Sequence, residues 1–227
     1  MKFTFNRNPI KVGNSIEQPP EEVIKNTSAL WNASLDDAIK YGGELTRAAI
    51  GAMNLKFDRK YIIVDTKIHM LMPTFYPALV GWHSDGVPRG KELNPVAKAA
   101  PDIQSQEELS DTRFHLLVTG TGCLTDFIEE QNVELEVPDE PDTSLYRMVS
   151  QQVDEKVVAG ELTRKTIPSC TAVEFDWFDL HTGVAAKEHE WRFLIRVTET
   201  DHMRPQTDLR KIIRTQQQVY LPQNFGW

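Results

Sequence analysis

Two histidines and one aspartate are the residues of this chain whose types and spacing point most clearly to chemistry. His83 and Asp85 are separated only by Ser84, and His181 follows roughly a hundred residues later. On a β-strand, residues i and i+2 project from the same face, so His83 and Asp85 can hold one ion together. Two imidazoles and one carboxylate form the facial ligand set that binds non-haem Fe(II) and leaves coordination positions open. We therefore expect a metal site, with His181 supplied by a separate strand.

Two arginines follow His181 on what the pattern predicts as the next strand. In the segment 191–198, Arg192 and Arg196 alternate with apolar residues and therefore share one face of that strand. Such a face either lies in solvent or lines a lumen, where an arginine can bind a carboxylate through two parallel hydrogen bonds. The residues alone leave both readings open.

Composition limits the class of protein. With 227 residues, 40% of them hydrophobic, we expect one domain over 1–227 with one sizeable core. The net charge of -8 does not indicate nucleic-acid binding. No window approaches the roughly 20 apolar residues of a membrane span, and the N-terminus lacks the apolar region of a signal peptide. The two distant cysteines, Cys123 and Cys170, suit a reducing compartment, so we expect a cytoplasmic protein with no membrane association.

The periodicity of apolar residues divides the chain into three regions. Residues 1–60 are predicted to be a mainly helical front that follows a short strand-like opening, with helix starts at 19–22 and at Ser34 and a weak point at Gly42 and Gly43. Residues 61–200 form the β core, and 201–227 a polar tail with enough apolar residues to dock. The strands are expected at 61–70, 79–83, 113–119, 133–137, 171–180 and 191–198.

One helix is expected within the β core. Asp142 or Thr143 would cap it, and it would close near Gly160. Many short strands of even spacing favour a mainly β fold with flanking helices, in which a closed sandwich or jelly roll can house a metal at its mouth.

The segment 86–112 leaves the predicted metal site directly after Asp85. It is rich in proline, glycine and charge, and a loop of this length inside a compact domain suggests a lid over a substrate. Trp82 and Arg89 lie close to the motif in sequence and are candidate substrate contacts. The alternative is that Trp82 is a core residue and Arg89 is solvated.

These residues together resemble the Fe(II)/2-oxoglutarate-dependent dioxygenases. The resemblance lies in the order His83-x-Asp85, His181, and arginines eleven and fifteen residues further on, and it covers about 61–198. It implies a double-stranded β-helix (jelly-roll or cupin-like) core and iron held by His83, Asp85 and His181. It also implies that Arg192 anchors the distal carboxylate of 2-oxoglutarate, and that Arg196 is a second contact to co-substrate or substrate. A threonine or tyrosine usually assists this arginine, and Thr119, Thr121 and Thr125 all remain open.

The function implied by the resemblance is hydroxylation of a substrate with decarboxylation of 2-oxoglutarate to succinate, using Fe(II) and O2. The substrate, a small molecule or a macromolecule, and the oligomeric state stay open. Two other classes also stay open. One is a cupin-like metal-binding jelly roll without 2-oxoglutarate chemistry. The other is a non-catalytic β-sandwich that serves as a structural or interaction module.

Overall fold

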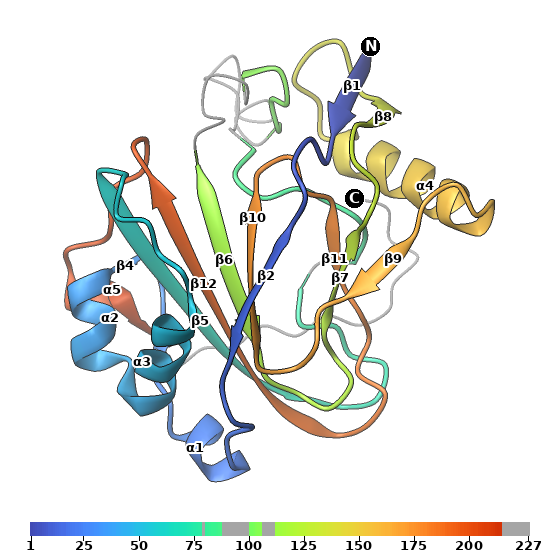
Figure 1. Cartoon of the computed structure of the whole chain (residues 1–227). Helices are drawn as coiled ribbons and strands as arrows, with labels where there is room; N and C mark the ends of the chain where they lie inside the picture. Colours follow the sequence, from blue (N-terminus) through green and yellow to red (C-terminus); the bar gives the residue numbers. More distant parts are fainter. Residues whose placement is uncertain (79, 88–99, 106–111, 215–227) are drawn as a thin grey trace.

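A six-stranded antiparallel sheet dominates the computed structural model, which describes residues 1–78, 80–87, 100–105 and 112–214 (Figure 1). Its strand order is β2-β10-β6-β12-β5-β4. The strands are β2 (Lys11–Ser15), β4 (Ala33–Ser34), β5 (Tyr61–Leu71), β6 (Arg113–Val118), β10 (Thr171–Asp176) and β12 (Glu190–Thr200). The mainly β class predicted from the sequence is confirmed, and β5 and β12 pair along their whole length at its centre.

A second, smaller sheet packs against the first. It has the order β11-β7-β9, formed by β11 (His181–Gly183), β7 (Thr125–Ile128) and β9 (Arg164–Thr166). The rings of Phe127 on β7 and Phe175 on β10 lie 5.2 Å apart, centroid to centroid. Because side chains of both sheets belong to one buried cluster, the sheets pack face to face. Two short pairs complete the β structure: β1 (Lys2–Phe5) with β8 (Val133–Glu136), and β3 (Ala29–Leu30) with β13 (Ile213–Arg214).

Three helices near the N-terminus accompany the main sheet: α1 (Glu21–Lys25), α2 (Leu35–Tyr41) and α3 (Gly43–Ala52). Ser34 caps α2 as predicted, because its hydroxyl accepts a hydrogen bond from the Asp37 N–H. The predicted weak point is also confirmed, since α2 ends at Tyr41 and Gly43 has a positive φ of 83°. Figure 1 shows α2 and α3 beside β5 and β12. Their buried alanines share a second core cluster with these strands.

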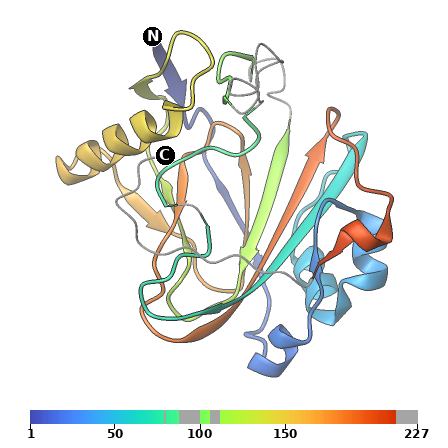
Figure 2. The ribbon, with the colours of Figure 1, turned by 180° about the vertical axis from the view of Figure 1, so that it is seen from behind.

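Helix α4 (Leu145–Val158) lies at the other end of the molecule, beside β8 and β9 in Figures 1 and 2. Val149 and Val153 are buried in the core between the two sheets. The predicted cap was displaced, because the helix follows Ser144 and the Asp142 carboxylate accepts from the Ser144 N–H instead. The C-terminal region adds the short α5 (Leu209–Ile212) before β13. No helix in the described part of the chain is long and apolar enough to cross a membrane.

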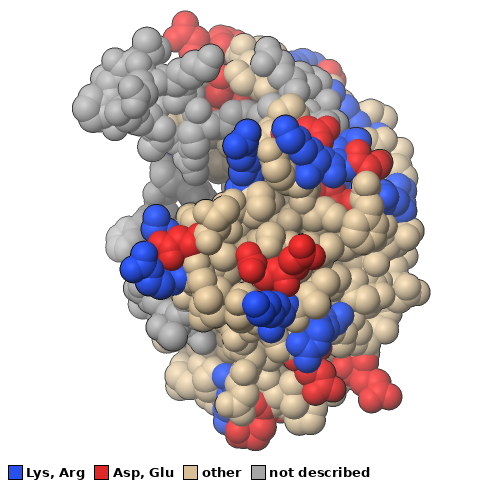
Figure 3. Space-filling model, turned by 90° about the vertical axis from the view of Figure 1, so that its left-hand side faces the viewer, with Lys and Arg blue, Asp and Glu red and all other residues tan. Residues whose placement is uncertain are grey.

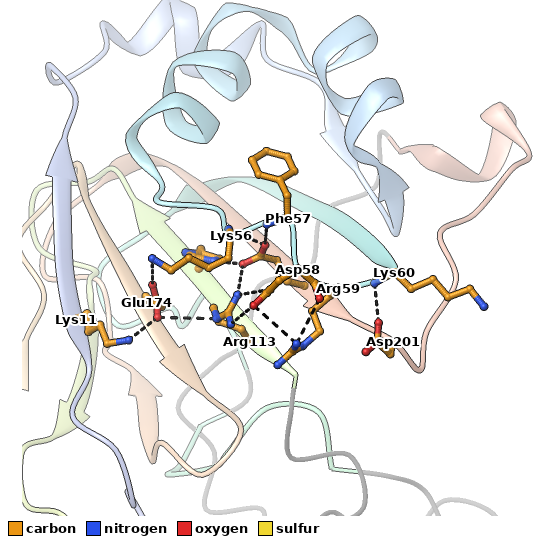
Figure 4. Close-up of polar contacts among 11 residues, drawn as sticks. Lys11, Lys56, Phe57, Asp58, Arg59, Lys60, Arg113, Glu174 and Asp201 are labelled. Carbon is orange, nitrogen blue, oxygen red and sulfur yellow. Dashed lines mark hydrogen bonds and ion pairs between the residues drawn. The ribbon is translucent and has the colours of Figure 1, made fainter.

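A buried ionic cluster holds the connection between α3 and β5 against the main sheet (Figure 4). The Glu199 carboxylate of β12 accepts hydrogen bonds from the backbone N–H groups of Lys56 and Phe57, both at 2.9 Å. It also pairs with Arg113 at 3.0 Å and with His115 at 2.8 Å. Glu199 is fully buried, so these four partners replace water around its charge.

Three sequence predictions about elements are corrected. The segment 79–83 is not a strand in its described residues; only His83 forms an isolated bridge, to His181. The strand expected over 171–180 ends at Asp176, because the Asp179 N–H bonds back to the Asp176 carbonyl in a turn before β11 begins. The front over 1–60 contributes β2 to the main sheet besides its helices.

Candidate metal centre

The structure brings His83, Asp85 and His181 together. One ligand atom from each lies within 4.8 Å of the others. His83 and His181 face each other across their bridge, where the His83 N–H donates to the His181 carbonyl at 3.1 Å and the reverse bond measures 2.9 Å. Directly opposed residues place their side chains on one side of a sheet, and the two imidazole centroids are 4.5 Å apart. The convergence predicted from the sequence is therefore present in the fold.

Both imidazoles are oriented by backbone carbonyls. The Nδ1 of His83 lies 3.0 Å from the Gly81 carbonyl oxygen, and the Nδ1 of His181 lies 3.1 Å from that of Asp179. A carbonyl oxygen only accepts, so each Nδ1 carries the proton and each Nε2 keeps its lone pair. This outer hydrogen bond is the usual support of a metal-binding histidine. The residues therefore fit a metal at the two Nε2 atoms.

The surroundings of the triad favour an ionised Asp85 carboxylate and a neutral His181 imidazole. The Arg196 Nη1 lies 2.9 Å from the Asp85 Oδ2, which is 3.8 Å from the His181 Nε2. Burial would raise the pKa of Asp85, but the charge and the hydrogen bond of Arg196 hold it well below its usual range. Burial and the neighbouring His83 lower the pKa of His181 to about 4. These are the protonation states that bind a divalent cation.

A cavity of about 740 Å³ contains the triad. One wall is the inner face of β5 and β12, where the register sets His69 opposite Arg192, and Asp65 opposite Arg196. The side chains on this face of the two strands are polar except for one leucine. They are Asp65, Lys67, His69, Arg192, Leu194 and Arg196.

Arg192 is buried in this wall with part of its guanidinium unpaired. Its side chain is 1% exposed, and its Nε donates to the Cys123 carbonyl at 2.6 Å. Its Nη1 has no hydrogen-bond partner among the described residues. Burial lowers the pKa of Arg192, which reflects the cost of holding the charge away from water. An unpaired buried donor on a cavity wall fits an anionic ligand.

Of the three threonines considered from the sequence, Thr125 alone lines the cavity. The Thr119 hydroxyl accepts from the Phe193 N–H, and the Thr121 hydroxyl donates to Glu190. Thr125 is therefore the threonine placed to meet a ligand beside Arg192. The sequence could not decide this, because the three residues follow one another in a single short segment.

Arg196 lies in the cavity wall as expected, with carboxylate partners of the protein itself. Its Nη1 pairs with Asp85, and its Nη2 lies 3.3 Å from the Asp65 carboxylate. Arg196 therefore orients Asp85, the carboxylate of the candidate metal site. Its contact with co-substrate or substrate stays a prediction.

Trp82, which the sequence offers as a substrate contact, is not among the residues that line the cavity. Trp82 is 2% exposed and lies in the core, where its indole N–H donates to Asp154 and its backbone N–H to Ser150, both on α4. The alternative reading of Trp82 as a core residue is thus the one the structure supports. Arg89 and most of the predicted lid 86–112 lie outside the described residues.

Sequence reasoning missed Asp65, Lys67 and His69 as cavity residues. The signal was present, because these three polar residues stand at i, i+2 and i+4 on a strand whose intervening residues are apolar or small. Which face of β5 meets the cavity, however, depends on the packing of α2 and α3 against the other face.

Comparison of the sequence with protein-family models and with curated proteins finds no match. Any functional inference therefore rests on the geometry of this cavity.

Proposed function

We propose that the protein is an Fe(II)- and 2-oxoglutarate-dependent dioxygenase that hydroxylates a substrate while 2-oxoglutarate is decarboxylated to succinate. The observation that carries the proposal is that one cavity is lined by the His83, Asp85 and His181 triad and by Arg192, whose Nη1 has no hydrogen-bond partner among the described residues. A metal ligand set alone fits many activities. A buried cationic donor in the same cavity adds a place for the far carboxylate of a dicarboxylic co-substrate.

The order of strands supports a double-stranded β-helix as the fold of the core. From β5 onward the chain enters the main sheet, reaches the second sheet through the His83 bridge, returns to the main sheet at β6 and crosses again to β7 and β9. It then passes to β10, to β11 and back to β12. This repeated alternation between two facing antiparallel sheets is the pattern of a jelly roll.

Each residue of the site has a distinct role in this proposal. His83, Asp85 and His181 would hold the iron on one side, and the bound iron supplies the oxygen chemistry. Arg192 would bind the distal carboxylate of 2-oxoglutarate, assisted by the Thr125 hydroxyl. A hydrogen bond to a charged group contributes about 1.5–3 kcal/mol. Arg196 would keep Asp85 ionised and oriented.

Anaerobic addition of Fe(II) and 2-oxoglutarate tests the proposal. We expect a weak visible charge-transfer band that needs both additions. In this titration, Arg192→Met should weaken the binding of 2-oxoglutarate. Arg210→Met, which alters an exposed arginine, should leave that binding unchanged. Metal binding without the band would favour the cupin-like class, and no metal binding at all would favour the structural module.

We also propose a cytoplasmic location. Cys123 and Cys170 are both buried free thiols, as expected of a protein that lives in a reducing compartment.

A further inference from the structure

The mouth of the cavity differs chemically from its floor. Leu116, Phe175 and Arg192 line the cavity and are buried, so they belong to its floor. Trp31 and Ile213 also line it and are 40% and 37% exposed, so they stand where it opens to solvent. Lys67 is likewise both exposed and part of the lining. The mouth therefore combines one ammonium group with an indole and an aliphatic side chain.

Lys67 has no ion-pair partner among the described residues, and the carboxylates of Asp85 and Asp65 act on its charge only from a longer distance. The acid two residues away, Asp65, already binds Arg196 and the backbone N–H of Asn32. The residue opposite Lys67 on β12 is Leu194, which offers no acceptor. Burial is the main cause that lowers the pKa of Lys67; Arg196 and Arg192 add to it, and Asp85 and Asp65 oppose it.

Counted over the charged side chains that line the cavity, the loaded site would keep one positive charge in excess. A divalent metal and doubly charged 2-oxoglutarate offset each other. The carboxylates of Asp65 and Asp85 offset the guanidinium groups of Arg192 and Arg196. Lys67 is the cation that remains. A substrate with a single negative charge would complete the balance in this partly desolvated space.

We propose that Lys67 binds the anionic group of the substrate, and that the substrate is a small organic acid whose apolar or planar portion packs against Trp31 and Ile213. This inference rests on the proposed function. It places the substrate contact on β5, and not at the buried Trp82.

A matched pair of probes tests the inference. The full chain is first loaded with Ni(II), which does not support turnover, and with saturating 2-oxoglutarate, which would occupy Arg192. 8-Anilino-1-naphthalenesulfonate carries a sulfonate on a planar apolar body, and N-phenyl-1-naphthylamine has the same body without it. We expect fluorescence titration to show tighter binding of the sulfonate. Lys67→Gln should weaken binding of the sulfonate probe about ten-fold or more and leave binding of the neutral probe unchanged.

Two control variants make the outcome specific. Lys67→Arg should keep sulfonate binding, and Lys60→Gln, which removes the ammonium group stacked on Tyr61 at the start of the same strand, should have no effect. Equal binding of the sulfonate by wild type and Lys67→Gln, an equal loss for both probes, or no sulfonate binding would overturn the inference. The Fe(II)/2-oxoglutarate band is recorded in the same variants. Its absence in wild type would refute the proposed function, whereas its presence with unaltered probe binding would refute the role of Lys67 alone.

Discussion

At the scale of single residues, the cavity is shaped by hydrogen bonds that satisfy some atoms and leave others open. Backbone carbonyls occupy the Nδ1 atoms of His83 and His181, and the His181 Nε2 lies 3.8 Å from the Asp85 carboxylate. The Arg192 Nε donates a hydrogen bond to the Cys123 carbonyl, and its Nη1 has no partner within the described residues. Buried polar groups are normally paired, so such a group is a candidate for binding.

Replacement of Arg192 should change the stability of the protein little and its affinity for 2-oxoglutarate strongly. Arg192→Met removes a buried charge that has no counter-ion at hydrogen-bond distance, so the free energy of unfolding without ligands should fall by less than about 1 kcal/mol or rise. The Kd for 2-oxoglutarate should rise about ten-fold or more, with metal affinity unchanged. Urea unfolding and isothermal titration measure the two effects. A destabilised variant with unchanged 2-oxoglutarate affinity would show that Arg192 is structural.

The two acids that share Arg196 should respond differently to neutralisation. Asp85→Asn removes a metal-binding carboxylate and should lower the affinity for a divalent metal about 100-fold or more. Asp65→Asn breaks the other Arg196 ion pair but keeps an acceptor for the Asn32 N–H, so metal affinity should change little. Titration with Mn(II) or Co(II) compares them. Equal losses would mean that Asp85 acts only through Arg196.

The triad was predictable from the sequence because its signal is local. His83 and Asp85 at i and i+2 share a face in any extended backbone, and His181 precedes the arginines in order. Thr125 and Lys67 could not be selected in the same way. Their exposure to the cavity depends on which face of each strand the rest of the protein covers.

At the scale of elements, long segments were predicted well and short ones were not. β5, β6, β12 and the break between α2 and α3 follow from periodicity and glycine placement. β7, β9 and β11 have three or four residues each, too few to show an alternation. These short strands form the second sheet, which carries His181. The second sheet, which supplies His181, was therefore the part of the fold that the sequence predicted least well.

Asn6 joins the N-terminal segment to the short strands around the site. It is buried with a positive φ of 50°, its side-chain amide donates to the Ile128 carbonyl, and its side-chain oxygen accepts from the Leu180 N–H. Asn6→Ala leaves both buried groups unpaired and should cost about 2–4 kcal/mol of unfolding free energy. Metal affinity should also fall, because Leu180 precedes His181.

The matched control is Asn8→Ala, which removes an exposed hydrogen bond to Asp176 and should change stability by less than about 0.5 kcal/mol. Urea unfolding of the two variants, followed by metal titration, provides the comparison. Similar stability of both variants would show that Asn6 does not hold the second sheet in place.

At the scale of the whole molecule, stability in acid should depend on the Glu199 cluster of Figure 4. Desolvation opposes ionisation of Glu199, but hydrogen bonds from His115, the Phe57 N–H and Arg113 prevail and lower its pKa to about 2. A lowered folded-state pKa stabilises the fold above the ordinary value near 4.5. That stabilisation is lost as the pH falls from about 4.5 toward 2.

Glu199→Gln should therefore lower the unfolding free energy at pH 7 by about 3 kcal/mol. The difference from wild type should shrink between pH 4.5 and 2. Glu161→Gln, which alters an exposed ion pair with Lys156, should match wild type throughout. Unfolding by urea at a series of pH values measures this. A constant difference between wild type and Glu199→Gln would contradict the pKa assigned to Glu199.

The net charge of -8 contrasts with the basic groups in the cavity. On the face shown in Figure 3, Lys and Arg are interspersed with Asp and Glu, without an expanse of one sign. Among the charged side chains that line the cavity, the positive charge in excess is instead that of Lys67 at the mouth. An anionic small molecule matches this distribution better than a long polyanion.

The most direct test of the central proposal is a crystal structure of the protein grown without oxygen in the presence of Fe(II) and 2-oxoglutarate. We expect one metal ion bound by the Nε2 atoms of His83 and His181 and by the Asp85 carboxylate. We also expect 2-oxoglutarate on that metal, with its distal carboxylate on Arg192. A metal bound elsewhere, or a co-substrate that does not contact Arg192, would contradict the proposal.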